Sequence, residues 1–224
     1  MLAGTTLSAR TNDSSGSSVT VLGNYGYNNT WRNYGGLDIR GFVPFGKHFE
    51  LKADAEVLTA GIFSGSVTFT PKFPLPVGEL FLDGTLNYRN LFKYKSAEFV
   101  TAASFGYRMD FVSVQAGLFY RGIFNTDRNA EGPYVGEKPV DMVYRVSFNV
   151  RPSTSRWNAG GGITNYNEYE YERMWQPMFF IDGHYDLSDS LSLLATVQVK
   201  QSGMFHQIVS FYGIDTKVGL RYEF

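Results

Sequence analysis

Three carboxylates at alternate positions are the residues in this sequence most suited to ion chemistry. The run Asn165-Tyr166-Asn167-Glu168-Tyr169-Glu170-Tyr171-Glu172 places Glu168, Glu170 and Glu172 on one face of an extended chain. Converging at the outer mouth of a pore, they could gate cations or bind Ca²⁺, which takes several oxygen ligands. The simpler interpretation, which we prefer, is a solvated acidic hairpin tip paired with nearby Arg173.

The histidines are the other residues with catalytic or metal-binding potential. His48, His184 and His206 do not cluster, which argues against zinc, and none has the Ser two residues away that membrane lipid hydrolases need. No Gly-x-Ser-x-Gly elbow is present. Asp182-Gly183-His184 superficially resembles the Asp-x-His pair of omptin proteases, but it lacks an Asp-x-Asp companion and falls low on a descending strand. We therefore expect no catalytic residues, no metal and no cofactor.

The composition narrows the class of protein. A net charge of −1 gives no sign of a nucleic-acid partner, and the absence of cysteine rules out disulfides and thiolate metal sites. Aromatic residues make up 17% of the 224 residues, Gly occurs 24 times, and only 18% are charged. That mixture is typical of glycine-containing strands with aromatic girdles. No run approaches a transmembrane helix and no signal peptide is visible, so we expect a mature form with Met1 added.

Segments of alternating polarity, separated by turn residues, must position the charged groups. In residues 49–57, for example, Phe49, Leu51 and Val57 share one face, while Lys52 and Asp54 share the other. The predicted strands are 18–27, 34–45, 49–59, 62–73, 79–90, 98–108, 111–122, 141–151, 156–167, 176–185, 190–200 and 213–224. Their lengths suit strands that cross a bilayer at a tilt.

The connections alternate between short and long. Gly46-Lys47-His48 and Met109-Asp110 are brief, whereas residues 123–139 and 201–212 form long segments on the opposite side. The short turn at Gly46–His48 would pair Phe45 with Phe49, which places Arg40 opposite Asp54. Residues 1–16 are rich in Ser, Thr and Gly, so we expect a flexible N-terminal segment followed by one barrel domain, 17–224.

The final residues carry a resemblance to a known class. A polar Lys217, Gly219, an aromatic Tyr222 and a terminal Phe224 resemble the C-terminal β-signal of bacterial outer-membrane barrels. The resemblance implies a closing strand that is read by the barrel-assembly machinery, a bacterial outer-membrane location and a C-terminus on the periplasmic side. The size is also similar to that of small twelve-stranded channel families, such as the acidic-oligosaccharide channels.

Alternation alone also fits a soluble β-sandwich or a lipocalin-like barrel that buries its apolar face. Twelve tilted strands would enclose a radius of about 12 Å, which apolar side chains alone would struggle to fill. We therefore predict an all-β fold, a transmembrane antiparallel up-and-down barrel of about twelve strands, with ten or fourteen as alternatives. Tyr residues including Tyr169 and Tyr171 would then face lipid near the outer ends, and Phe residues such as Phe45 and Phe73 near the inner ends.

Because side chains alternate between the two faces of each strand, a set of charged side chains is expected to face the lumen of this barrel. The lumen-lining candidates are Arg40, Lys52, Asp54, Arg89, Arg108, Arg121, Arg145, Arg151, Lys200 and Arg221. A salt-bridged network that fills the barrel is one interpretation, and a narrow water-filled pore that slightly favours small anions is the other. We predict a passive channel whose partners are outer-membrane lipid and the assembly machinery. The alternative is a non-conducting accessory barrel that docks with another outer-membrane protein through small outward residues such as Ala159 and Gly161.

Overall fold

The computed structural model describes residues 16–30, 32–125, 133–134, 139–152, 155–203 and 210–224. Their strands are β1 (Ser18–Asn28), β2 (Arg32–Phe45), β3 (Phe49–Leu58), β4 (Ile62–Pro74), β5 (Glu79–Leu91), β6 (Ser96–Arg108), β7 (Val112–Asn125), β8 (Pro133–Tyr134), β9 (Val140–Val150), β10 (Trp157–Thr164), β11 (Met178–Asp186), β12 (Leu191–Gln201) and β13 (Phe211–Glu223). A single 3₁₀ turn, η1 (Phe92–Tyr94), joins β5 to β6. The predicted flexible segment 1–16 lies outside the described residues, apart from its last residue.

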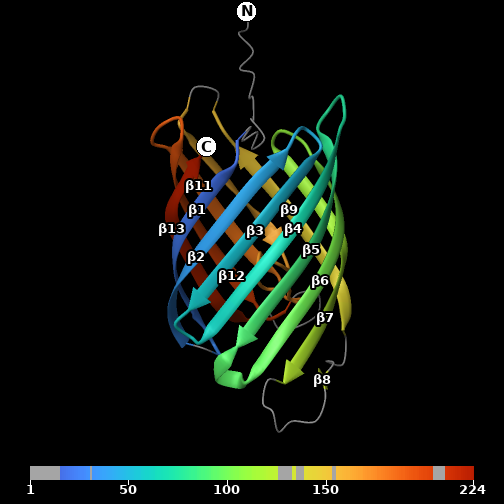
Figure 1. The fold of residues 1–224 in the computed structure, drawn as a ribbon, viewed down its shortest axis with the longest axis vertical. Coiled ribbons are helices and arrows are strands. Elements are labelled where there is room, and N and C mark those ends of the chain that lie inside the picture. The colour runs from blue at the N-terminus through green and yellow to red at the C-terminus, as the bar shows by residue number, and fades with distance from the viewer. Residues whose placement is uncertain (1–15, 31, 126–132, 135–138, 153–154, 204–209) are drawn as a thin grey trace, which may run out of the picture.

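The long strands close into one antiparallel barrel (Figure 1). Each long strand pairs with the next along the chain, with β7 pairing with β6 and β9, and β13 pairs with β1 from Ser18↔Glu223 to Asn28↔Gly213. The barrel therefore has twelve strands, and the predicted closing role of the C-terminal strand is confirmed. The short β8, which the sequence did not predict, adds only a two-residue pairing to the end of β7.

The sequence period of two decides the register. Phe45 pairs with Phe49 across the turn that Gly46 makes at φ 64°, a conformation that glycine adopts without steric cost. Arg40 consequently stands opposite Asp54, as predicted. Among the described residues no helix is long and apolar enough to cross a membrane.

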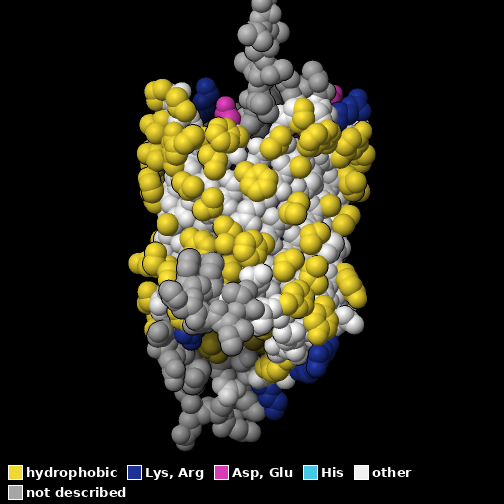
Figure 2. Space-filling model, turned by 180° about the vertical axis from the view of Figure 1, so that it is seen from behind, with side chains coloured by type: hydrophobic (Ala, Val, Ile, Leu, Met, Phe, Trp, Pro, Cys, Tyr) yellow, Lys and Arg dark blue, Asp and Glu magenta, His cyan; other side chains and the backbone are white. Residues whose placement is uncertain are grey.

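The barrel wall has polar residues on its enclosed face and apolar residues on its exposed face, the reverse of the arrangement in a soluble protein. Asp38 is fully buried, and Glu56 and Lys217 are 5% and 7% exposed, whereas Ile181 is 69% exposed. Figure 2 shows apolar side chains spread over the outer wall, with Lys and Arg toward both ends and Asp and Glu near the upper end of the view. Since the charged face is the enclosed one, the soluble interpretation is wrong.

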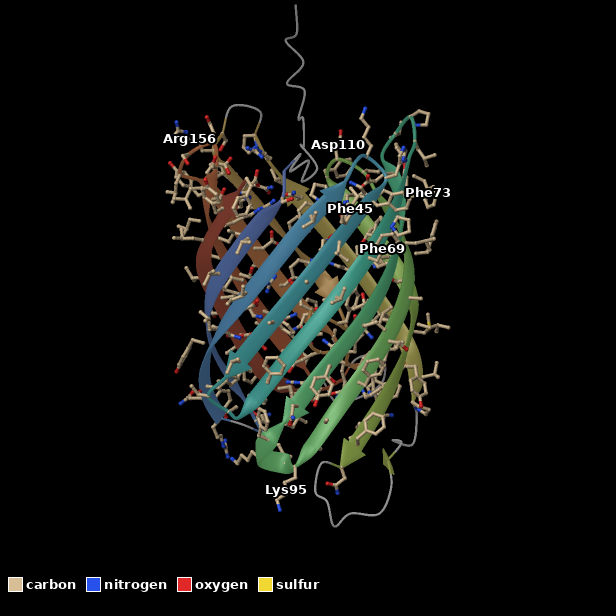
Figure 3. All side chains as sticks on the ribbon, in the orientation of Figure 1. Phe45, Phe69, Phe73, Lys95, Asp110 and Arg156 are labelled. Carbon is tan, nitrogen blue, oxygen red and sulfur yellow. The ribbon has the colours of Figure 1, made fainter. Side chains whose placement is uncertain are left out.

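Glycines on the inner face allow rings from neighbouring strands to lie across them. A Cβ on Gly106 would stand 2.2 Å from the ring of Phe81, and one on Gly26 would stand 2.3 Å from the ring of Tyr34. On the outer face, Phe45 and Phe73 lie toward the end that carries the turn at Asp110, and Lys95 lies at the other end (Figure 3). The inner wall is thus shaped by aromatic rings as well as by charges.

Candidate functional site

The chain leaves the barrel wall at Asn165 and turns into the lumen. Asn165 is fully buried, and its Nδ2 donates hydrogen bonds to the carbonyl oxygens of Met142 (2.7 Å) and Glu172 (2.8 Å). Its Oδ1 accepts a hydrogen bond from the backbone N–H of Tyr144 at 2.8 Å. The side chain therefore takes the place of backbone partners along β9, and the strand ends at Thr164 instead of continuing to 167 as predicted.

Residues Asn165–Glu172 form a tight hairpin, here called the lumen hairpin. Its ends are joined by the bond from Glu172 N to Asn165 O (2.7 Å), and Tyr166 bridges to Tyr171. At the tip, the Asn167 Oδ1 accepts hydrogen bonds from the N–H groups two and three residues later, both at 2.8 Å. This is the local turn that an Asn side chain favours, so the hairpin holds its own shape.

Aromatic packing anchors the base of the lumen hairpin. The ring of Tyr171 lies 5.5 Å from those of Phe119 and Tyr166, and it packs with Val100 and Val143 on the inner wall. The Tyr166 hydroxyl donates to Gln115 Oε1 at 2.6 Å. Aromatic pairs at such separations add to the free energy of apolar burial. An apolar inner patch over β6, β7 and β9 is thereby covered by the hairpin.

Ion pairs hold the tip. Glu168 binds Arg40 at 2.7 Å, and Glu170 binds Arg89 at 2.5 Å and also Lys200. The Tyr169 hydroxyl donates to Asp38 Oδ1 at 2.8 Å. Asp38 in turn pairs with Arg40 (2.8 Å) and Lys217 (2.7 Å). Because most of these groups are enclosed, the loss of one partner would leave a buried charge uncompensated.

Two carboxylates of the loop between β10 and β11 have opposite pKa shifts. Burial acts to raise the pKa of Glu170, but the nearby Lys200 and Arg89 more than offset it and hold that pKa well below its usual range. Burial, together with the charge of Glu170, raises the pKa of Glu172. Glu170 therefore stays ionised in mild acid and keeps its cationic partners.

The predicted environment of this segment is wrong in two respects. Tyr169 and Tyr171 are 3% and 4% exposed inside the barrel and do not face lipid. Glu168 and Glu170 pair with cations of the wall and not with Arg173, whose guanidinium lies over Trp175. Among the described residues, no group of His, Asp and Glu side chains is arranged to hold a metal ion, so the Ca²⁺ interpretation finds no ligand set.

Other predicted lumen residues pair locally. The ion pairs are Arg108–Glu79 (2.8 Å), Arg121–Glu98 (2.7 Å), Arg151–Asp186 (2.8 Å) and Arg221–Glu223 (2.9 Å). Asp54 accepts a hydrogen bond from Ser66 at 3.2 Å. Arg40 faces Asp54 in register, yet its guanidinium binds Asp38. His184 contacts Asp186 at 2.8 Å, so the Asp182–His184 motif forms no pair of its own.

The lumen hairpin fills the barrel unevenly. Between its tip and the wall that holds Tyr34, Glu56 and Lys200, only about 10 Å³ is open. On the side of β9, β11 and β13 a cavity of about 210 Å³ remains, bordered by Arg145, Phe180, Asp182, Asp215 and Lys217 and by the hairpin residues Tyr166, Asn167 and Glu168, among others. Of these two spaces beside the hairpin, the one on this second side is the larger.

No protein-family model and no curated protein matches the sequence. Solved structures do match over nearly the whole chain. The KdgM porin in complex with disordered oligogalacturonate matches with a TM-score of 0.54 at 13% identity, covering 92% of this chain and 99% of that one. The fold is that of bacterial outer-membrane β-barrels.

Two further structures support that assignment of the fold. The NanC porin matches with a TM-score of 0.54 at 10% identity, covering 91% of this chain and 100% of its own. The translocator domain of the autotransporter NalP from Neisseria meningitidis matches with a TM-score of 0.54 at 11% identity, covering 93% of this chain and 88% of that one. These outer-membrane barrels include two porins and the translocator domain of an autotransporter, so the shared fold does not choose among functions.

Proposed function

We propose that the protein is a narrow passive channel of the bacterial outer membrane, which passes small solutes and slightly favours anions. The observation that carries the proposal is the uneven filling of the lumen: the hairpin occupies one side, and a charged cavity of about 210 Å³ lies open on the other. A barrel filled throughout by salt bridges would have no such space. The porin-like neighbours KdgM and NanC, which share the fold, agree with this proposal.

The slight anion preference rests on two inward cations. Arg145 borders the cavity, and Lys52 projects from the inner face of β3; neither has a carboxylate within ion-pair distance in the described part of the chain. Positive charge in a narrow, partly desolvated passage attracts anions. Asp182 and Asp215, which border the same cavity, oppose that attraction, so the proposed preference for anions is only slight.

The lengths of the connections support an orientation of the barrel in the membrane. The short turns Gly46–His48 and Met109–Asp110 lie at the end where the C-terminus also lies (Figure 1). Short turns are typical of the periplasmic side, so we place the C-terminus there. Lys217, Gly219, Tyr222 and Phe224 would then meet the barrel-assembly machinery as the last strand enters the membrane.

Conductance of the refolded full chain in a planar bilayer tests the proposal. We expect discrete current steps and a reversal potential of the sign that anion preference gives under a salt gradient. Replacement of both unpaired cations (R145Q with K52Q) should move that potential toward zero, whereas K47Q in the exposed turn after β2 should not. A folded barrel that never conducts would overturn the channel.

The accessory-barrel function is kept as the second candidate because of one observation. Ala159, Gly183 and Ala195 align in register across β10, β11 and β12 on the outer face. A row of small residues lets another membrane element approach closely. This function would be favoured by a barrel that does not conduct but co-purifies with a second outer-membrane protein. The Ala195→Phe variant should then no longer co-purify with that protein.

A further inference from the structure

The charged groups around the 210 Å³ cavity fall into two classes. Arg40, Lys217 and Glu168 are engaged in ion pairs with carboxylates or cations of the wall and hairpin. Arg145, Asp182 and Asp215 border the same cavity and form no ion pair within the described ranges. The cavity thus presents one cation and two carboxylates that have no direct ion-pair partner in the described part of the chain.

Arg145 is held in a fixed orientation. Its guanidinium lies over the ring of Phe180, 4.6 Å from the centroid, and Phe180 is 7% exposed. Gly162 makes that arrangement possible, since a Cβ there would stand 3.0 Å from the Phe180 ring and 2.2 Å from the carbonyl oxygen of Val146. A guanidinium stacked on a ring keeps its N–H edge free, and that edge matches the two oxygens of a carboxylate.

The two carboxylates that border the cavity have room and unused capacity to accept hydrogen bonds. Asp215 is only 6% exposed, and its Oδ1 is buried without a hydrogen-bond partner among the described atoms. Asp182 lies two residues beyond Phe180 on the inner face of β11, and the space it uses is left open by Gly160, whose added Cβ would stand 3.0 Å from Asp182 Oδ2. A buried acceptor without a donor is costly, so a bound donor would stabilise it.

We propose that the cavity binds a small zwitterion of the amino-acid class, with its carboxylate on Arg145 and its ammonium group on Asp182 and Asp215. A simple anion would satisfy only Arg145, and a simple cation only the carboxylates. The cavity is smaller than the roughly 300–1,000 Å³ of pockets for drug-sized ligands, in keeping with a small solute. The inference rests on the proposed channel, because the lumen supplies the route to this cavity.

Binding by the refolded full chain in detergent micelles tests the site without requiring conduction. The probes are 4-aminobutyrate, butyrate and butylammonium, measured by titration calorimetry. We expect 4-aminobutyrate to bind at least about tenfold more tightly than either singly charged analogue, a difference of about 1.4 kcal/mol. Equal binding of butyrate would overturn the inference by showing a plain anion site.

Two variants and two controls locate the site. R145Q and D215N should each weaken binding of 4-aminobutyrate at least about tenfold, since each removes one charge-assisted contact. K52Q and D54N remove an inward cation and an inward carboxylate that do not border the cavity, and should leave binding unchanged. Equal loss in the controls would overturn the assignment to this cavity.

The same protein in a planar bilayer separates this inference from the channel. Current steps that 4-aminobutyrate interrupts more often than butyrate does would support both proposals. Current steps with no selective binding in micelles would overturn the zwitterion site and leave the channel intact. Selective binding by a barrel that never conducts would overturn the channel and support the binding site.

Discussion

At Gly219 the packing between neighbouring strands of the barrel requires a residue without a side chain. A Cβ at this position would stand 1.9 Å from the carbonyl oxygen of Val21 and 2.7 Å from the Cα of Leu22. Leu22 is 3% exposed and lies beside Gly219 on the inner face. The glycine that resembles part of an assembly signal therefore also has a packing reason, because no side chain fits where β13 meets β1.

Substitution of this glycine should weaken the seam that closes the barrel. We expect Gly219→Ala to destabilise the folded protein by about 1–3 kcal/mol, because overpacking forces a backbone shift. The matched control is Gly183→Ala on the outer face of β11, where an added Cβ meets nothing within 4 Å. Urea unfolding in lipid vesicles measures both. Equal midpoints for the two variants would show that the seam adjusts without cost.

At the scale of elements, the lumen hairpin combines a local turn with distant partners. The bond from Asn165 to Glu172 and the bonds to the Asn167 side chain shape it. Its place in the lumen depends on Phe119, Arg89 and Lys200 from three different strands. The first kind of contact is local in sequence and the second is not. The hairpin is stable in the lumen only if both sets are made together.

The ion pair between Glu170 and Arg89 offers a test of this arrangement. Their side chains are 10% and 9% exposed, so removing one partner should cost about 3–5 kcal/mol of hairpin docking. We expect E170Q to increase the single-channel conductance and its noise as the hairpin loosens. The double variant E170Q/R89Q should recover part of the wild-type behaviour, since Arg89 is then no longer a buried charge without its partner, and only Lys200 still lacks the carboxylate of Glu170.

A conductance in E170Q equal to that of the wild type would show that the aromatic base and the remaining tip contacts, those of Glu168 and Tyr169, hold the hairpin without Glu170. Ser66→Ala serves as the control, because it removes an inward polar contact to Asp54 that does not involve the hairpin.

The strands and their register were predictable because alternation is local and every turn constrains the next pairing. Arg40 opposite Asp54 follows directly from pairing Phe45 with Phe49. The inward turn after Thr164 was not predictable, since the Tyr–Glu alternation of 166–172 continues the pattern of the preceding strand and therefore points the tyrosines toward lipid. A signal existed in Phe119 and Val143, apolar residues at inward positions that needed a cover. The alternation of polar and apolar residues does not indicate which loop covers them.

For the whole molecule, the decisive feature is which face of the wall meets lipid. Ile181, near the middle of β11, is 69% exposed, whereas Asp182 beside it in sequence borders the inner cavity. The same strand therefore presents apolar groups outward and charged groups inward. A substitution should thus have opposite effects at neighbouring positions.

Arginine substitutions would measure this difference. We expect Ile181→Arg to destabilise the barrel in vesicles by about 2–4 kcal/mol, the cost of a charge in the hydrocarbon region. Thr196→Arg, on the inner face of β12 and bordering the cavity, should cost much less because water and carboxylates are nearby. Equal costs would show that the outer face does not lie in hydrocarbon.

The span of the hairpin's contacts also has a consequence for assembly and stiffness. Glu168 reaches Arg40 across 128 residues of sequence, Tyr169 reaches Asp38 across 131, and Glu170 reaches Arg89 across 81. Contacts between residues so far apart in sequence need the strands around them to be in place, so we expect the hairpin to dock late in folding. The docked hairpin connects Val100 and Phe119 on one part of the wall with Arg40 and Lys200 on others. We therefore expect it to stiffen the barrel against the lateral pressure of the acyl chains.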